Sequence, residues 1–354
     1  MDPSYAHSMA KSSPTALRSL IWEGSIPISF VLEPSELPSG SDRGVEAFYV
    51  GEMILAQYSN PFSSQILAFL AFMFILQTSA PRMSYLSLLV PIVKTNLIGL
   101  CLDDNSLFTM KEENVWFEHA PSKVALKWHW PIGLIYDTLL ASLPSSSLGL
   151  PLQVTVHLNP VPADKGLLPN SIPVCREAFM SQIKEADFVR WGSTRRVTNL
   201  RQREAESLWE GLVEHDFDKF WLVASKLVPI PPSPSSAHSA PMPHTQPPNS
   251  SIDRMPDGNG VRNVPLRVYL PENIPVIQAL SGPVDETGRR VTLGAALVDL
   301  APSLFPEPTS TSKRRLARAF IHGVQVPLET ELGWLGAVMC CADGWVAVVI
   351  HLGR

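Results

Sequence analysis

One lysine of the chain has neighbours that distinguish it from an ordinary solvated lysine. Lys184 lies in the stretch FMSQIKEADFVRWGS, residues 179–193. In a helix, where successive residues turn by about 100°, this stretch places Met180, Phe188 and Trp191 on the side of that lysine. Apolar neighbours disfavour the charged form of an amine, and an amine attacks an acyl group only after it loses its proton. The pattern therefore predicts either a stem that follows the edge of an apolar stripe or an amine that is acylated.

A histidine and two aspartates form the nearest approach to a metal site. His215, Asp216 and Asp218 fall together in EHDFDKF, and imidazole and carboxylate groups are common ligands of zinc. One short cluster supplies neither a fixed geometry nor supporting groups around the ligands. A solvated, acidic helix end is the simpler interpretation, and we expect no metal and no cofactor. A hydrolase or metal enzyme that uses these three residues stays open as an alternative.

The cysteines indicate a reducing compartment rather than a disulfide framework. The chain has four cysteines, of which Cys340 and Cys341 are adjacent, a spacing that fits neither a disulfide scaffold nor a zinc motif. These two and Cys175 could serve as nucleophiles if basic groups favoured the thiolate, but a cysteine between apolar residues is usually a small hydrophobic side chain. The motifs GxxxxGK[ST], GxGxxG, GxSxG and HExxH do not occur. We therefore expect that the chain alone is not an enzyme.

Charge and hydropathy limit the classes of partner. A net charge of −5 argues against bulk attraction to nucleic acid. A local cluster, Arg195, Arg196, Arg201 and Arg203, could contact acidic lipid headgroups or an acidic partner, or form a solvated helix face. The N-terminus does not resemble a secretion signal, so we expect a cytoplasmic protein. The apolar run at residues 66–76 is shorter than the roughly 20 residues that a membrane-spanning helix needs. We expect a buried or interfacial segment there, with a membrane anchor as the alternative.

The hydrophobic pattern predicts two small modules of similar layout. Residues alternate between apolar and polar at 124–130, 152–158 and 264–270, as in half-buried strands, and further strands are expected at 28–32, 116–120, 320–327 and 345–352. An apolar segment at 84–102 should be a helix that ends or kinks at Pro91. Thr292 should cap a second helix at 293–305. A mixed sheet packed on one helix is the β-grasp fold of ubiquitin, so we predict an α+β protein.

The region between the two modules is amphipathic and helical, and prolines mark the domain boundary that follows it. Nine of the 33 prolines fall between Pro229 and Pro256, which is typical of an extended linker. The predicted domains are an N-terminal tail at 1–16, a ubiquitin-like domain at 17–160, a helix-rich domain at 161–228, a linker at 229–262 and a second ubiquitin-like domain at 263–354.

A series of motifs in one order resembles a known family. PRMSYLSLL (81–89), LKWHWPIGLIYD (126–137), LQVTVHL (152–158), FMSQIKEAD (179–187), LWEGL with FDKFW (208–221), VTLGAALVDL and HGVQVPLETELGWL (322–335) are similar to segments of the autophagy protein 5 family. The resemblance implies two ubiquitin-like domains that flank a helix-rich domain. It also implies that Lys184 receives the C-terminal glycine of the ubiquitin-like autophagy protein 12 through an isopeptide bond.

The resemblance further implies a set of partners and a place in the cell. Conjugated family members bind a helix of autophagy protein 16 in a groove between the domains. They direct autophagy protein 3 to transfer autophagy protein 8 onto phosphatidylethanolamine, and autophagy protein 10 acts in the conjugation itself. The expected location is the cytoplasm, with peripheral contact at the phagophore assembly site membrane. The side chains Met180, Phe188 and Trp191 would offer an apolar platform to the attached protein.

One segment departs from the pattern of the family. Family members continue from the strand near Phe48 almost directly into the PR-x-SYL motif, whereas this chain has an atypical insert at 51–79 that contains the apolar run. A surface loop of such apolar composition is hard to keep in solution. We therefore hypothesise that the insert is a translated intron, which transcript sequencing across codons 50 to 80 tests.

Overall fold

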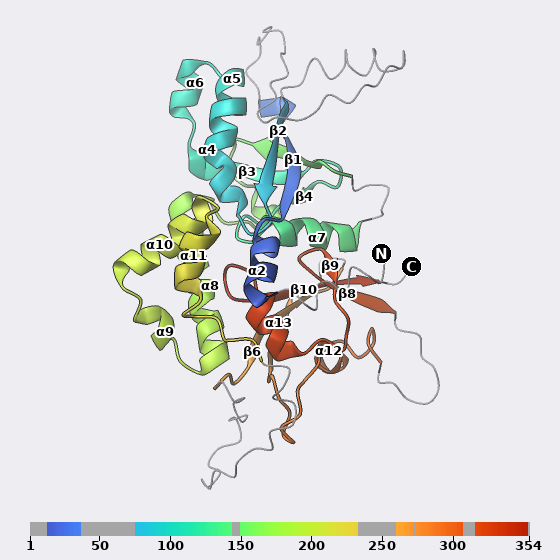
Figure 1. Ribbon diagram of the computed structural model, residues 1–354. Helices are drawn as coiled ribbons and strands as arrows, with labels where there is room; N and C mark the ends of the chain where they lie inside the picture. The colour runs from blue at the N-terminus through green and yellow to red at the C-terminus, as the bar shows by residue number, and fades with distance from the viewer. Residues whose placement is uncertain are drawn as a thin grey trace. The chain divides into compact units, whose positions relative to one another are not determined.

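The structure is a computed structural model that describes residues 13–36, 75–143, 149–232, 260–271, 274–306 and 316–352. The chain divides into two compact units. Unit A comprises Ser25–Tyr136 and Leu143–Glu177, and unit B comprises Met1–Gly24, Asp137–Ser142 and Ala178–Arg354. Each unit contains one five-stranded sheet, and both sheets are drawn in Figure 1.

The sheet of unit A is mixed, as a β-grasp requires. Its order is β2-β1-β5-β3-β4; β1 runs parallel to β5, and the other neighbours are antiparallel. Phe30, Phe117 and Val154 are buried on one face and form part of the core, because alternate residues of a strand share a face. The strands are β1 (Ser25–Leu32), β2 (Ile75–Pro81), β3 (Trp116–His119), β4 (Val124–Ala125) and β5 (Leu152–His157).

Helical turns follow one another from Leu86 to Cys101, where the sequence predicts a helix. Pro91 lies in the first turn of α4, where its missing N–H group costs no hydrogen bond, so the proline does not end the helical path. The helical elements of unit A are η1 (Pro34–Glu36), η2 (Leu86–Leu89), α4 (Val90–Val93), the π-helix η3 (Lys94–Ile98), α5 (Gly99–Cys101), α6 (Asp104–Thr109), η4 (Glu112–Asn114) and η6 (Ala163–Lys165). Helix α7 (Ile132–Ser142) follows β4, and the sequence pattern did not indicate it.

Two expectations for this part of the chain are wrong. The alternating stretch 124–130 forms only the two-residue strand β4, because the chain turns after Ala125; Leu126 and Trp128 are nevertheless buried. Residues 75–79, assigned to the atypical insert, lie in β2 and pair with β1 from Ser25↔Pro81 to Val31↔Ile75. The remainder of the predicted insert, 51–74, lies outside the described residues.

The sheet of unit B repeats the topology, in the order β7-β6-β10-β8-β9. Strand β10 runs parallel to β6 and antiparallel to β8. Leu266, Val268, Val348 and Ile350 pack into one core with helix α12. The elements are β6 (Val264–Tyr269), β7 (Ile277–Ser281), α12 (Leu293–Leu300), β8 (Ala317–Ile321), β9 (Val324–Gln325), α13 (Leu332–Val338) and β10 (Val346–Leu352).

One helix cap of unit B is confirmed and one strand is corrected. The Thr292 hydroxyl accepts a hydrogen bond from the amide of Ala295 and so caps α12, as the sequence predicts. The stretch 320–327, predicted as one strand, instead contains the end of β8, a turn and β9, which form a hairpin. The turn between them places His322 at φ 52° and Gly323 at φ 77°, in the left-handed region that glycine adopts without steric cost.

The other helices of unit B are α2 (Pro14–Trp22), α8 (Ile172–Trp191, from residue 178), α9 (Arg195–Thr198), α10 (Gln202–Val213) and α11 (Phe217–Ala224). Helix α2 corrects the predicted first boundary, because residues 17–24 were assigned to the first ubiquitin-like domain. Leu17 instead packs into the core of the second sheet. Arg18 donates to the carbonyl of Ala337 at 2.8 Å, which ties α2 to the end of α13.

The candidate site around Lys184

Lys184 lies in the middle of α8, on its exposed side. Phe179, Ile183 and Asp187 lie on the opposite, buried side, at the spacing of three to four residues that one helix face requires. The Phe179 ring packs against the Trp209 ring of α10 with centroids 5.6 Å apart. The helix is therefore a rigid support that holds the lysine towards solvent.

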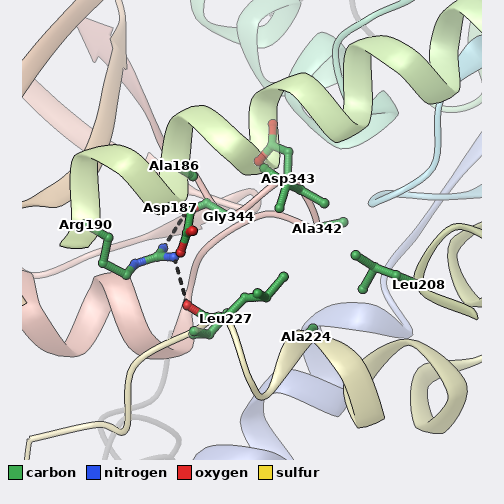
Figure 2. A pocket seen from close by; sticks show the side chains of 11 residues that line it. Ala186, Asp187, Arg190, Leu208, Ala224, Leu227, Ala342, Asp343 and Gly344 are labelled. Carbon is green, nitrogen blue, oxygen red and sulfur yellow. Dashed lines mark hydrogen bonds between the residues drawn. The ribbon is translucent and has the colours of Figure 1, made fainter. Parts of the chain in front are cut away.

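A buried arginine attaches the C-terminal part of α8 to two loops. Arg190 is 2% exposed. Its Nη2 donates to the carbonyl of Gly344 at 2.7 Å and its Nη1 to the carbonyl of Leu227 at 3.4 Å, as Figure 2 shows. The backbone carbonyl of Arg190 also accepts a hydrogen bond from the amide of Arg262 at 2.9 Å. Two carbonyl oxygens and one backbone amide from three other parts of the unit thus fix the end of helix α8.

Two aspartates lie beside this arginine around a small cavity. Asp187 and Asp343 are 1% and 4% exposed, and both line a cavity of about 20 Å³, shown in Figure 2. Burial raises the pKa of each carboxyl group, although hydrogen bonds from the amide of Val197 to Asp187 and of Trp345 to Asp343 act in the opposite direction. Oδ1 of Asp187 has no protein partner among the described residues. The cavity has room for about one water molecule, which could satisfy that oxygen.

A second attachment lies one turn earlier in the helix. Arg267 of β6 donates Nη1 to Oε1 of Gln182 at 2.8 Å and pairs through Nη2 with Glu185 at 3.2 Å. The guanidinium lies over the ring of Trp345, 3.8 Å from its centroid. Nε1 of Trp345 donates to the backbone carbonyl of Gln182 at 3.2 Å. The residues on both sides of Lys184 are therefore held against the second sheet.

Lys184 differs from the other lysines that the structure describes in having no partner. It takes part in no hydrogen bond, ion pair or aromatic contact within the described ranges. Each other described lysine has a carboxylate within 4.0 Å or an aromatic ring within 4.0 Å of its ammonium. Those lysines are Lys94, Lys111, Lys123, Lys127, Lys165, Lys219 and Lys226.

The three predicted apolar neighbours have different surroundings. Phe188 is 58% exposed, whereas Met180 is half-buried. Trp191 is also half-buried, and the guanidinium of Arg196 covers its ring at 3.7 Å. Because Lys184 itself is exposed, these neighbours do not desolvate its amine in the free chain. Phe188 is the most accessible apolar surface of the three, so the predicted contribution of these neighbours to desolvation would require a bound partner.

The predicted arginine cluster lies at the start of the helices that follow α8. Arg195 and Arg196 belong to α9, Arg201 precedes α10 and Arg203 lies in its first turn. All four are exposed. Arg196 is partly engaged by the Trp191 ring, so the cluster keeps its exposed positive charge without forming an enclosed anion site.

Two of the three residues that suggested a metal site have structural contacts of their own. The His215 ring stacks on the Trp22 ring at 5.3 Å with an interplanar angle of 5°, and burial lowers the pKa of this histidine. Asp216 caps α11 by accepting from the amide of Lys219 at 2.9 Å, while Asp218 lies exposed in the first turn. Within the described ranges, no three His, Cys, Asp or Glu side chains gather in a way that could hold a metal ion.

Cys101, Cys175 and Cys341 are buried, and Cys340 is partly buried. Burial raises the pKa of Cys175 to about 11 and that of Cys101 to about 12. Burial also raises the pKa of Cys340 and of Cys341. Because the thiolate is the nucleophilic form, these environments disfavour a reactive cysteine.

Three residues that hold the helix were not predicted from the sequence, namely Arg190, Arg267 and Trp345. One signal was available for Arg267. It occupies the polar position between Leu266 and Val268 in an alternating strand, and must therefore lie on the face opposite these two core residues. No local signal exists for Arg190, because its acceptors are 37 and 154 residues away in the sequence.

The two mixed sheets have identical topology, and each has the helices of a β-grasp. Together with the bundle of α8, α10 and α11, they define a protein of two ubiquitin-like domains and a helical region. Three family models match in this order: the UblA domain of autophagy protein ATG5 at residues 63–158, its alpha-helical bundle region at 172–230 and its UblB domain at 263–350. The chain belongs to the autophagy protein 5 family, and its function lies in autophagy. The match of the UblA model from residue 63 includes part of the segment that was taken for an insert.

Individual relatives agree with this assignment. Autophagy protein 5 of Penicillium rubens is 25% identical over 354 residues, which cover 95% of this chain and 97% of the relative. Autophagy protein 5 of Neosartorya fischeri is 29% identical over 77% of this chain and 85% of the relative. The crystal structure of Kluyveromyces marxianus Atg5 matches with a TM-score of 0.61 at 18% identity, over 94% of this chain and 98% of that one, which supports the fold. No helix in the described part of the chain has the length and apolar character to cross a bilayer.

Proposed function

We propose that this chain is the covalent acceptor of a ubiquitin-like protein, autophagy protein 12, through Nζ of Lys184. The observation that carries the proposal is the free state of this amine: Lys184 is exposed on a rigid helix and, among the described lysines, it alone has no counter-ion or aromatic partner. An acceptor amine must be reachable and must not be held by a carboxylate, since a paired ammonium keeps its proton more tightly. The membership in the autophagy protein 5 family supports the identity of the donor.

The reaction is an aminolysis. The C-terminal glycine of the ubiquitin-like protein arrives as a thioester on an E2-like enzyme, autophagy protein 10. After the Lys184 ammonium gives a proton to a base of that enzyme or to solvent, the amine nitrogen attacks the thioester carbonyl carbon. A C–N isopeptide bond forms, the C–S bond breaks, and the nitrogen gives its second proton to the departing cysteine thiolate or to solvent. A free lysine has a pKa near 10.4, so the enzyme must desolvate the exposed amine.

Phe188, one turn away and 58% exposed, is an apolar surface on which the enzyme or the attached protein can pack, with Met180 and the edge of Trp191 as secondary contacts.

The conjugate then serves as a scaffold. With a helix of autophagy protein 16, it would promote the transfer of autophagy protein 8 to phosphatidylethanolamine by the E2-like autophagy protein 3, at the phagophore assembly site membrane. In this role the chain contributes binding surfaces and no catalytic residue. The exposed arginines Arg195, Arg196, Arg201 and Arg203 are the candidates for contact with acidic headgroups or an acidic partner.

The test compares two lysine substitutions in the full-length chain, expressed in its own cells. Lys184→Arg keeps the charge and removes the nucleophile, so it should abolish the species that is larger by one ubiquitin-like protein. Lys111→Arg is the matched control, because Lys111 has the weakest contact among the paired lysines, at 4.0 Å from Glu113 with 69% of its side chain exposed. The control should be conjugated at the wild-type level. Normal conjugation of Lys184→Arg would refute the proposal.

A further inference from the structure

We infer that Arg267 is a positioning residue for conjugation, which holds the carboxylate of Glu185 away from Lys184 and so keeps the acceptor amine without a counter-ion. The inference rests on the proposed function. It adds a residue from the second ubiquitin-like domain to the requirements of the acceptor site.

The geometry directs Glu185 away from the lysine. Arg267 projects from the face of β6 opposite the core residues Leu266 and Val268. Its guanidinium is fixed by the Trp345 ring at 3.8 Å. In this fixed orientation Nη2 pairs with Oε2 of Glu185 at 3.2 Å. The Arg267 side chain is 15% exposed. The group that binds Glu185 near the sheet is therefore held in place by its surroundings.

Glu185 is the carboxylate that matters for Lys184. Within one helical turn on either side of the lysine, residues 180–188, the acidic residues are Glu185 and Asp187. Asp187 is buried and its Oδ2 accepts from the amide of Val197, so it is not available to an exposed ammonium. Glu185 is 54% exposed in its side chain and directly follows the lysine. Without Arg267 its negative charge would lie free beside the acceptor amine.

A free carboxylate in that place would oppose acylation. An opposite charge nearby favours the protonated amine, and the attacking species is the neutral amine. Adjacent residues of a helix do not face each other, so we expect a moderate effect. A displacement of about half a pH unit corresponds to a roughly threefold smaller fraction of free amine at a given pH.

The experiment measures single-turnover transfer from the thioester of the cognate ubiquitin-like protein on its E2-like enzyme to the full-length chain, from pH 6.5 to 9. Four chains are compared: wild type, Arg267→Gln, Glu185→Gln and the double variant. Arg267→Gln should transfer about three times more slowly at pH 7, with a pH–rate profile about 0.5 unit higher. The double variant should return to the wild-type profile, and Glu185→Gln alone should not be slower than wild type. Discharge of the same thioester to free lysine corrects for the pH dependence of the enzyme.

The double variant separates charge from architecture. Both Arg267→Gln and the double variant lack the Arg267–Glu185 ion pair, so a purely structural role predicts that they are equally slow. That result would overturn the inference, as would one common pH–rate profile for all four chains. Arg267→Lys retains a cation for Glu185 and should keep the wild-type profile. Conjugation of wild type through a lysine other than Lys184 would instead refute the proposed function.

Discussion

The two ubiquitin-like sheets have the same topology and differ in what is bound to the face opposite their core. In unit A that face carries Trp116, Glu118 and His157, with the Trp116 and His157 rings stacked at 3.9 Å. In unit B it carries Arg267 and Trp345, with the guanidinium over the indole at 3.8 Å. The first face is acidic at its centre and the second is cationic.

The difference decides which segment each sheet can hold. Glu118 binds Lys165, in the connecting segment that follows β5, at 3.0 Å, and Lys123 at 3.5 Å. The cationic face of unit B instead binds Gln182 and Glu185 of α8. One fold thus serves two purposes: in unit A it retains a loop, and in unit B it retains the helix that presents Lys184.

The largest effect is expected from the arginine that anchors α8. Arg190→Leu should destabilise unit B by about 3–5 kcal/mol, because it removes the charged hydrogen bonds to the carbonyls of Leu227 and Gly344 and the favourable charge interaction with the buried Asp187. Chemical denaturation of the full chain measures the change. Arg289→Leu is the control: Arg289 is exposed, so its loss should stay within about 0.5 kcal/mol. Equal effects of the two substitutions would show that Arg190 does not anchor the helix.

A smaller effect is expected from the centre of the acidic face. Glu118→Gln should destabilise unit A by about 1–2 kcal/mol, because hydrogen bonds to charged groups are lost. Burial raises the pKa of Glu118, but the hydrogen bond and charge of Lys165, with His157 and Lys123, outweigh it and leave the pKa below its ordinary value. A lowered pKa stabilises the folded state above the unfolded pKa of about 4.3. The difference in the free energy of unfolding between wild type and variant should therefore be constant at neutral pH and shrink as the pH falls below about 4. A difference that stays constant down to acid pH would contradict the ion network.

The smallest effect, and the opposite sign, is expected from Asp343 of unit B. Burial raises the pKa of this carboxyl group, so the folded chain binds its proton more tightly than the unfolded chain does. The charged form then penalises folding as the pH rises from about 4. Asp343→Asn keeps an oxygen that can accept from the amide of Trp345 and removes the charge. Thermal unfolding should show that the variant gains stability relative to wild type from pH 4 to pH 7, and a gain that is independent of pH would contradict the assignment.

Local sequence patterns predicted the strands and helices that depend on interactions between residues close in sequence. The alternation in β6, the cap at Thr292 and the helical periodicity around Lys184 each depend on neighbours within a few residues, and each appears in the structure. The stretch 124–130 alternates in the same way but forms a strand only at Val124–Ala125, because the chain turns at 127–130, where the amide of Trp130 donates to the carbonyl of Lys127. Alternation reports burial and not strand pairing.

The role of Lys184 stays a prediction, and the residues that support its helix were not predicted. Lys184 was reached from its helix pattern and the family resemblance. Its lack of a partner could not be predicted, because that depends on Arg267, 82 residues from Glu185. Such contacts follow from the tertiary fold, and no spacing rule within α8 indicates them.

The central claim concerns the bond at Lys184, and peptide mapping of the conjugate tests it most directly. The species that is larger by one ubiquitin-like protein is purified from cells, digested with trypsin and sequenced by tandem mass spectrometry. The account predicts one branched peptide, in which the C-terminal glycine of the ubiquitin-like protein is joined to Nζ of Lys184 and trypsin does not cleave after this residue. A branch on another lysine, with an unmodified and cleaved Lys184, would contradict the account.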